Sequence, residues 1–99
     1  MQLDLLESMT DLDRKFSEYD RDNPEVYKRL VVLTRQAKAR GRNKIGIGML
    51  FEVIRWEQYL ATKGDDYKMN NNYRSRYARK LMIEYPEFEG MFNVRELRS

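Results

Sequence analysis

Apolar side chains recur every three or four residues in several separate stretches of this chain, and no other feature constrains its fold as strongly. This spacing places the apolar residues on one face of an α-helix, whereas a half-buried strand would need strict alternation. Both prolines, Pro24 and Pro86, stand at the ends of such stretches. The sequence therefore predicts a mainly all-α fold, a small bundle of about four or five helices that forms one domain over residues 1–99.

The first 22 residues form an acidic amphipathic segment, in which a helix is expected over about residues 3–19. Its apolar residues are spaced alternately four and three apart, as in an a/d stripe: Leu5, Met9, Leu12, Phe16 and Tyr19. The stripe can pack on the core of the same chain. It can also form the seam of a homodimer through Leu5, Met9, Leu12 and Phe16. It is too short for the spacing to choose between these alternatives.

The remaining segment, residues 23–99, is expected to form the core of the bundle. A second helix should run from Pro24 to about Ala39. Asn23 is a good N-cap for this helix, and Gly41 suits the position just after its end.

A third helix is expected over about residues 47–61, because its apolar residues again follow helical spacing. Apolar residues alternate where it begins, so a short strand near Ile45 stays an alternative. Trp56 and Tyr59 fall on or near the polar side of this helix. A tryptophan in such a place is either the edge of a core or the anchor of a protein interface.

A basic fourth helix is expected over about residues 71–85, with one of the asparagines at positions 70–72 as its cap and Pro86 as its stop. A short terminal helix should follow and dock its apolar side chains on the core: Phe88, Met91, Phe92, Val94 and Leu97. The residues predicted at the centre of the core are Leu30, Leu50, Ile54 and Leu81.

The composition excludes several kinds of active site. The chain has neither cysteine nor histidine, so it lacks thiolate nucleophiles, disulfides, and the commonest general base and metal ligand. We therefore expect a protein that is not an enzyme and has no cofactor. One weak alternative is a magnesium-dependent nuclease that uses the carboxylates of Glu52, Glu57, Asp65 and Asp66.

Nothing in the sequence predicts export or insertion into a membrane. The acidic N-terminus lacks the basic region of a signal peptide. The longest nearly apolar run, residues 45–51, is far shorter than the about 20 residues that cross a bilayer. We expect a cytoplasmic protein, in a bacterium or in a host cell.

Positive charge gathers in two blocks of the sequence. Residues 26–55 hold eight basic side chains and one acidic one, and residues 68–82 hold five basic side chains and no acidic one. Residues 1–25, in contrast, hold three basic and eight acidic side chains. Clustered cations raise the local potential far more than the net charge of +3 suggests, and they favour an acidic partner such as nucleic acid.

The stretch KMNNNYRSRYARKL, residues 68–81, suits a surface that reads nucleic acid. Together with the preceding helix it resembles a helix-turn-helix, in which the start of the second helix meets base edges in the major groove. Arginine pairs with guanine and asparagine with adenine, so the candidates for base contacts are Asn71, Asn72, Arg74, Ser75 and Arg76. Phosphate contacts are expected from Arg79, Lys80, Arg40, Arg42 and Lys44. We therefore predict binding to double-stranded DNA.

Other interpretations of the same residues stay open. The connector of about nine residues before the fourth helix is longer than a helix-turn-helix turn. Asparagines commonly cap helices, Tyr73 and Tyr77 can belong to the core, and arginines can simply be solvated. The acidic first helix could bind a basic partner or lie over the molecule's own basic surface. A protein-interaction module, such as an inhibitor of a host protein, is the alternative function.

Two longer stretches, NPEVYKRLVVLTRQAKARGRNKIGIGMLFEVIRW and YKMNNNYRSRYARKLMIEYPEFEGMFNVRELRS, resemble a family of small uncharacterised proteins from phages, prophages and bacteria. The resemblance covers roughly residues 16–99. It is carried by Asn23-Pro24, Arg55-Trp56, residues 70–73, Tyr77-Ala78-Arg79, Pro86 and residues 95–98. It implies a phage or bacterial origin, and it assigns no site residue.

Overall fold

The computed structural model describes residues 2–62 and 69–93, and the side chains of residues 11–62 and 69–93. Within these ranges the chain forms four α-helices and two short 3-10 helices: α1 (Gln2–Asp22), α2 (Pro24–Ala39), α3 (Ile47–Ala61), η1 (Asn71–Tyr73), α4 (Arg74–Glu84) and η2 (Pro86–Phe88). The predicted all-α fold is confirmed. The alternative of a strand near Ile45 is wrong, because the described residues around it form no strand.

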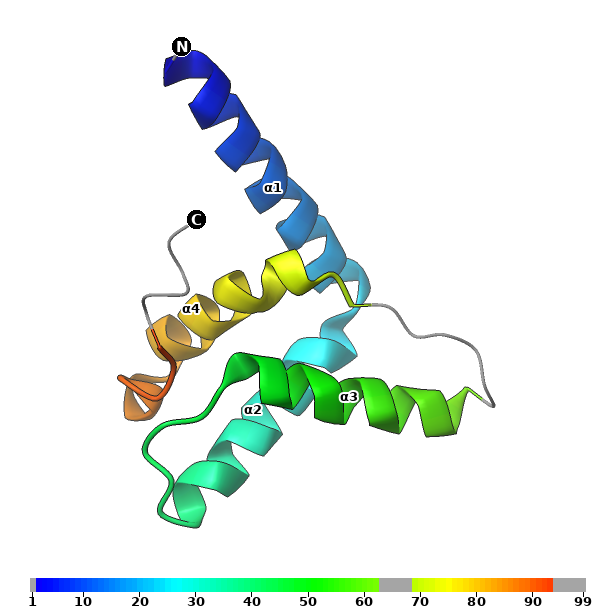
Figure 1. Ribbon diagram of the computed structural model, residues 1–99, viewed down its shortest axis with the longest axis vertical. Helices are drawn as coiled ribbons and strands as arrows, with labels where there is room; N and C mark the ends of the chain where they lie inside the picture. The colour runs from blue at the N-terminus through cyan, green and yellow to red at the C-terminus, as the bar shows by residue number, and fades with distance from the viewer. Residues whose placement is uncertain (1, 63–68, 94–99) are drawn as a thin grey trace.

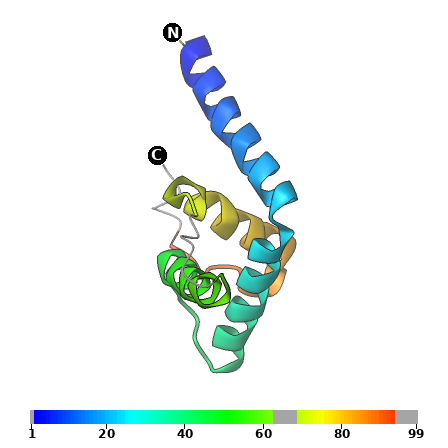
Figure 2. The ribbon, with the colours of Figure 1, turned by 90° about the vertical axis from the view of Figure 1, so that its right-hand side faces the viewer.

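Helices α1 and α2 together form a long bent rod, and α4 lies in the bend (Figure 1). Helix α3 packs beside α2 and α4, and the N-terminal end of α1 extends away from the other helices (Figures 1 and 2). The body of the molecule is therefore built by α2, α3 and α4, and only part of α1 covers it.

The bend between α1 and α2 lies at Asn23. The Tyr19 carbonyl accepts hydrogen bonds from the Asn23 backbone N–H at 2.8 Å and from its side-chain Nδ2 at 2.9 Å. Asn23 is the N-cap residue of α2, as predicted, but its side chain makes no capping bond to α2 and closes α1 instead. Pro24 is the first residue of α2, as predicted, and the end at Ala39 is also confirmed.

Helix α2 ends in a Schellman motif centred on Gly41. Gly41 has a φ of +85°, a conformation that side-chain-bearing residues rarely adopt. The Arg42 N–H donates to the Ala37 carbonyl at 2.9 Å, and the Gly41 N–H donates to the Lys38 carbonyl at 2.9 Å. These bonds turn the chain sharply, and they present the following basic residues at the end of the molecule.

The core lies between α2, α3, α4 and the residues after η2. All the residues predicted at its centre are buried: Leu30, Leu50, Ile54 and Leu81. Tyr77 is buried among aromatic rings, with Phe16 edge-on at 4.8 Å and Phe51 edge-on at 6.0 Å between ring centroids. Its burial confirms the alternative in which Tyr77 belongs to the core.

The described side chains of the apolar stripe of α1 pack within the same chain. Leu12, Phe16 and Tyr19 pack against the core. The side chains of Leu5 and Met9 lie outside the described part of the structure. A homodimer through all four of the predicted residues stays a prediction, but it would have to share Leu12 and Phe16 with the core.

The chain after α4 differs from the sequence prediction. Pro86 ends α4 as expected, but the described residues that follow form only the 3-10 helix η2 and irregular turns in place of a terminal α-helix. Gly90, with a φ of +78°, interrupts helical geometry. Phe88, Met91 and Phe92 are nevertheless buried, as predicted. The expected docking of Val94 and Leu97 concerns positions outside the described residues.

Candidate nucleic-acid interface

An asparagine cap opens the segment that leads into α4. The Asn70 side-chain oxygen accepts a hydrogen bond from the Asn72 N–H at 2.9 Å, which confirms the predicted cap. Asn71 is held from outside by Arg55 of α3, whose Nη2 donates to the Asn71 side-chain oxygen at 2.5 Å and to the Met69 carbonyl at 3.3 Å. The Asn71 amide is therefore fixed in place, and Asn72 beside it is exposed.

Arg74, the first residue of α4, is exposed and lies over the start of α3. Its Nε donates to the Asn71 carbonyl at 3.3 Å. Its Nη1 lies only 2.9 Å from the point where a Cβ on Gly48 would stand. The glycine therefore makes room for the guanidinium group at the first turn of α3.

Arg76 and Lys80 do not face solvent as the sequence suggested. Arg76 is only 16% exposed, and its Nε contacts a carboxylate oxygen of Asp13 at 2.7 Å. Lys80 pairs with Asp20, and its Nζ lies 4.2 Å from the centre of the Tyr27 ring. The expectation that both side chains project outward without carboxylate partners is wrong, because the acidic helix α1 lies across this part of α4.

The other residues of the predicted recognition helix divide between the surface and the packed side. Ser75 is half-buried and Arg79 is exposed. Tyr73 is buried against the rings of α1, with centroid distances of 5.2 Å to Tyr19 and 5.7 Å to Phe16. Tyr73, the last residue of η1, thus belongs to a packing surface between helices and cannot contact bases.

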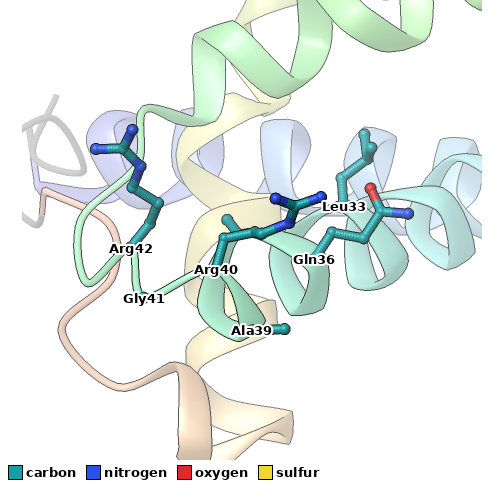
Figure 3. A pocket seen from close by; sticks show the side chains of 7 residues that line it. Leu33, Gln36, Ala39, Arg40, Gly41 and Arg42 are labelled. Carbon is teal, nitrogen blue, oxygen red and sulfur yellow. The ribbon is translucent and has the colours of Figure 1, made fainter.

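Arg40, Arg42 and Lys44 lie in the turn and loop between α2 and α3, and all three are exposed. None of them forms an ion pair with the described part of the chain. The backbone around Gly41 and the end of α2 line an open pocket, with Leu33, Gln36, Ala37, Ala39, Arg40 and Arg42 around it. The side chain of Arg40 reaches back along α2 toward Leu33 and Gln36, and that of Arg42 points to the other side (Figure 3).

Two further polar links join the helices of the body. Arg29 of α2 donates to both carboxylate oxygens of Glu57 on α3, at 2.8 and 2.6 Å, and this bidentate contact lowers the pKa of Glu57. Tyr27 donates to a carboxylate oxygen of Glu84 at 2.7 Å. Burial, followed by the bond to Glu84, raises the pKa of Tyr27, so its hydroxyl stays protonated as a donor.

The contacts between α3 and α4 differ from those of a helix-turn-helix. Arg74 at the start of α4 touches the first turn of α3 at Gly48, and Arg55 further along α3 reaches Asn71. Nine residues, 62–70, separate α3 from η1, where the motif has a turn of three or four. The two helices therefore meet through their starts and sides rather than through a tight turn.

The described residues offer little to the nuclease alternative. They contain no cluster of three or more acidic residues that could hold a metal ion. Glu57 is engaged by Arg29, and Glu52 is paired with Arg55. The candidate carboxylates Asp65 and Asp66 lie outside the described residues.

Among the described helices, none has both the length and the apolar character needed to cross a bilayer.

The sequence offered the alternative in which the acidic first helix lies over the basic surface of the molecule, but it did not identify Asp13 and Asp20 as the partners of Arg76 and Lys80. The two acids are seven residues apart, close to two helical turns, so they share one side of α1. Arg76 and Lys80 are one turn apart on α4. The pairs could not be derived from these spacings, because the acids are about two turns apart and the cations only one turn apart. They form because α1 lies across α4.

Comparisons with protein-family models, with curated proteins and with solved structures found no match for this chain.

Proposed function

We propose that this protein binds double-stranded DNA through a cationic surface made by Arg40, Arg42, Lys44 and Arg74, called here the loop surface. One observation carries the proposal. All four side chains are exposed, and none forms an ion pair with the described residues, whereas Arg76 and Lys80 are paired with acids of α1.

Three of the four cations of the loop surface lie close together in the sequence. Arg40, Arg42 and Lys44 occupy alternate positions of one loop, which leads directly into α3. Arg74 extends this surface from α4, because its guanidinium lies on the first turn of α3 at Gly48. Cations in such an arrangement suit a row of phosphates along a DNA backbone.

Sequence preference would come from residues where η1 and α4 meet this surface. Asn72 and Arg74 are exposed at the start of η1 and α4, and these residue types pair with adenine and guanine edges. Asn71 is less free to turn toward a base, because Arg55 already binds its side-chain oxygen. Ser75 and Arg79 lie further along α4. The proposal does not depend on Arg76 or Lys80.

The test compares two triple variants that remove the same charge from different places. The first is Arg40→Gln, Arg42→Gln, Lys44→Gln. The matched control is Arg14→Gln, Lys15→Gln, Arg21→Gln, which changes three exposed cations of α1. Helix α1 lies at the other end of the molecule from the α2–α3 loop (Figure 1). Affinity for a labelled duplex is measured by fluorescence anisotropy at several salt concentrations.

We expect the loop variant to lose three phosphate contacts. At about 0.9 for each contact, the slope of log affinity against log salt should then become shallower by about 2.7. The α1 control should keep nearly the slope of the wild type. Equal weakening by both triple variants, or a wild type without salt-dependent binding, would refute the proposal.

A protein-interaction module is the second candidate function, and a specific observation favours it. Trp56 and Tyr59 are 60% and 50% exposed on α3, and their rings stack with centroids 6.0 Å apart. Exposed aromatic pairs of this kind are typical anchors of protein interfaces. A wild type that leaves DNA unbound at low salt would shift the assignment to this candidate.

A further inference from the structure

Helix α3 has two opposite apolar faces, which are separated by edges that carry Glu52, Arg55 and Glu57. One face enters the core with Ile47, Leu50, Phe51 and Ile54. The opposite face is also apolar, and its large side chains are exposed: Met49 at 58%, Trp56 at 60%, Tyr59 at 50% and Leu60 at 59%. A helix face that is this apolar is normally covered, but the described residues leave these four side chains largely exposed.

The outer face has the spacing of a helix that pairs with another helix. Met49, Val53, Trp56 and Leu60 are separated by four, three and four residues, which is the a/d pattern of a coiled-coil seam. Val53 is half-buried between its exposed neighbours. These four residues form a stripe along α3, called here the α3 stripe, with Tyr59 and Glu52 along one edge.

We infer that the α3 stripe is the interface of a homodimer, in which α3 packs antiparallel against α3 of a second copy. The stripe is its own complement in this orientation. Met49 meets Leu60 of the partner subunit, and Val53 meets Trp56 of the partner subunit, because each pair is placed symmetrically about the same point of the helix. Small Val53 lies opposite large Trp56, which lets the side chains interlock. A parallel pairing would instead place the Trp56 side chains of the two copies next to each other.

The polar edges of the stripe also suit a second copy. Antiparallel packing brings Glu52 near Tyr59 of the partner subunit, so the phenol O–H can donate to the carboxylate. On the other edge, Glu57 is already neutralised by Arg29 at 2.6 Å. Glu52 is paired with Arg55 of the same helix. Among the described residues of α3, neither glutamate beside the stripe is therefore an unpaired charge that would repel another copy.

The exposed area indicates how strong this association should be. About half to three-fifths of each of four large side chains is exposed. Since large side chains bury about 150–250 Å² each, the pair of copies would cover roughly 1,000 Å². Interfaces of about 1,000 Å² belong to the small end of specific complexes. We therefore expect self-association at micromolar concentrations rather than an obligate dimer.

The chain provides its own reporter of this interface, because Trp56 is its only tryptophan. Sedimentation velocity and tryptophan emission are followed from low micromolar to submillimolar concentrations. The wild type should change from monomer to dimer, and its emission should shift to shorter wavelength over the same range. A wild type that stays monomeric with an unchanged emission maximum overturns the inference and leaves the stripe to another partner.

Charged substitutions then locate the interface. Leu60→Glu and, independently, Met49→Lys should abolish the dimer while leaving the far-UV circular dichroism unchanged, since both side chains are mostly exposed. The matched control is Ile83→Glu on α4, which changes an apolar side chain that is 75% exposed but lies outside the stripe. Ile83→Glu should dimerise like the wild type. Dimers that survive both stripe variants, or that are lost equally in the control, exclude the α3 stripe.

The orientation is tested by disulfide trapping, which is clean because the chain has no cysteine. Met49→Cys and Leu60→Cys chains are mixed in equal amounts and oxidised mildly. An antiparallel pair should give mainly the mixed disulfide, which mass spectrometry distinguishes from the two symmetric products. A predominance of symmetric products refutes the antiparallel pairing. The inference does not rest on DNA binding, since these variants leave Arg40, Arg42 and Lys44 intact and the two properties are measured separately.

Discussion

The pair between Asp20 of α1 and Lys80 of α4 offers the sharpest test of how α1 is held. Asp20 is 15% exposed and Lys80 is 29% exposed, so both charges are largely removed from water. The Lys80 ammonium also lies 4.2 Å from the centre of the Tyr27 ring. Asp20→Ala therefore leaves a cation in a site with little water and one remaining partner.

The expected loss of stability in Asp20→Ala follows from the attraction between the two charges and the desolvation that opposes it. At about 4 Å and an effective dielectric constant of about 20, the attraction of two unit charges is about 4 kcal/mol. Most of this is offset by desolvation, and a hydrogen bond to a charged group contributes about 1.5–3 kcal/mol net. The contact with Tyr27 keeps part of the stabilisation of Lys80. We therefore expect Asp20→Ala to lower the free energy of unfolding by about 2 kcal/mol.

Urea unfolding followed by circular dichroism measures this change. The cycle includes Asp20→Ala, Lys80→Ala and the double variant, and we expect a coupling energy of about 1–2 kcal/mol between the two positions. Asp11→Ala is the control, because Asp11 pairs with Arg14 on the exposed side of the same helix. That variant should leave the unfolding free energy nearly unchanged. A coupling below about 0.5 kcal/mol, or equal effects of Asp20→Ala and Asp11→Ala, would refute the reasoning.

Three further predictions concern the body of the protein. Leu50→Ala should lower the free energy of unfolding by about 2–5 kcal/mol, measured by urea denaturation, since Leu50 is buried in the core. Gly41→Ala should lower the melting temperature, because φ is +85° and the misfit costs about 1 kcal/mol; unchanged melting would contradict the Schellman geometry. Because Arg29 lowers the pKa of Glu57 in the folded chain, this pair should stabilise the protein above the ordinary glutamate pKa and stop doing so as the pH falls through the lowered value. The melting temperatures of wild type and Glu57→Gln should therefore differ at neutral pH and converge in acid.

The sequence was most informative where structure depends on neighbouring residues. The bounds of α2 and α3 were predicted, because Pro24, Gly41 and the apolar spacing act locally. Asn23 was predicted correctly as the N-cap residue of α2, but the role of its side chain was not, because that side chain can bond to the helix before it or to the helix after it and only the bend between the two decides which. The prediction of a terminal helix is wrong at Gly90, where the backbone has a positive φ that an α-helix does not allow.

The candidate site was harder to predict, because it depends on which helices lie together. Arg76 and Lys80 look like solvent-facing cations when α4 is considered alone. They lose that character because Phe16 packs edge-on against Tyr77 and brings the acidic side of α1 over α4. None of the described helices lies across the loop that carries Arg42, so its exposed charge could be anticipated from the sequence.

Because Arg74 approaches Gly48 closely, a substitution at this uncharged position would change where the Arg74 charge lies. An alanine methyl group at position 48 would displace the guanidinium, which lies 2.9 Å from the place the methyl carbon would occupy. The same substitution should strengthen α3 itself, because alanine favours a helix by about 1 kcal/mol over glycine. In Gly48→Ala, thermal stability should rise while DNA affinity falls at constant net charge. Variation at this glycine would thus tune ligand binding through geometry alone.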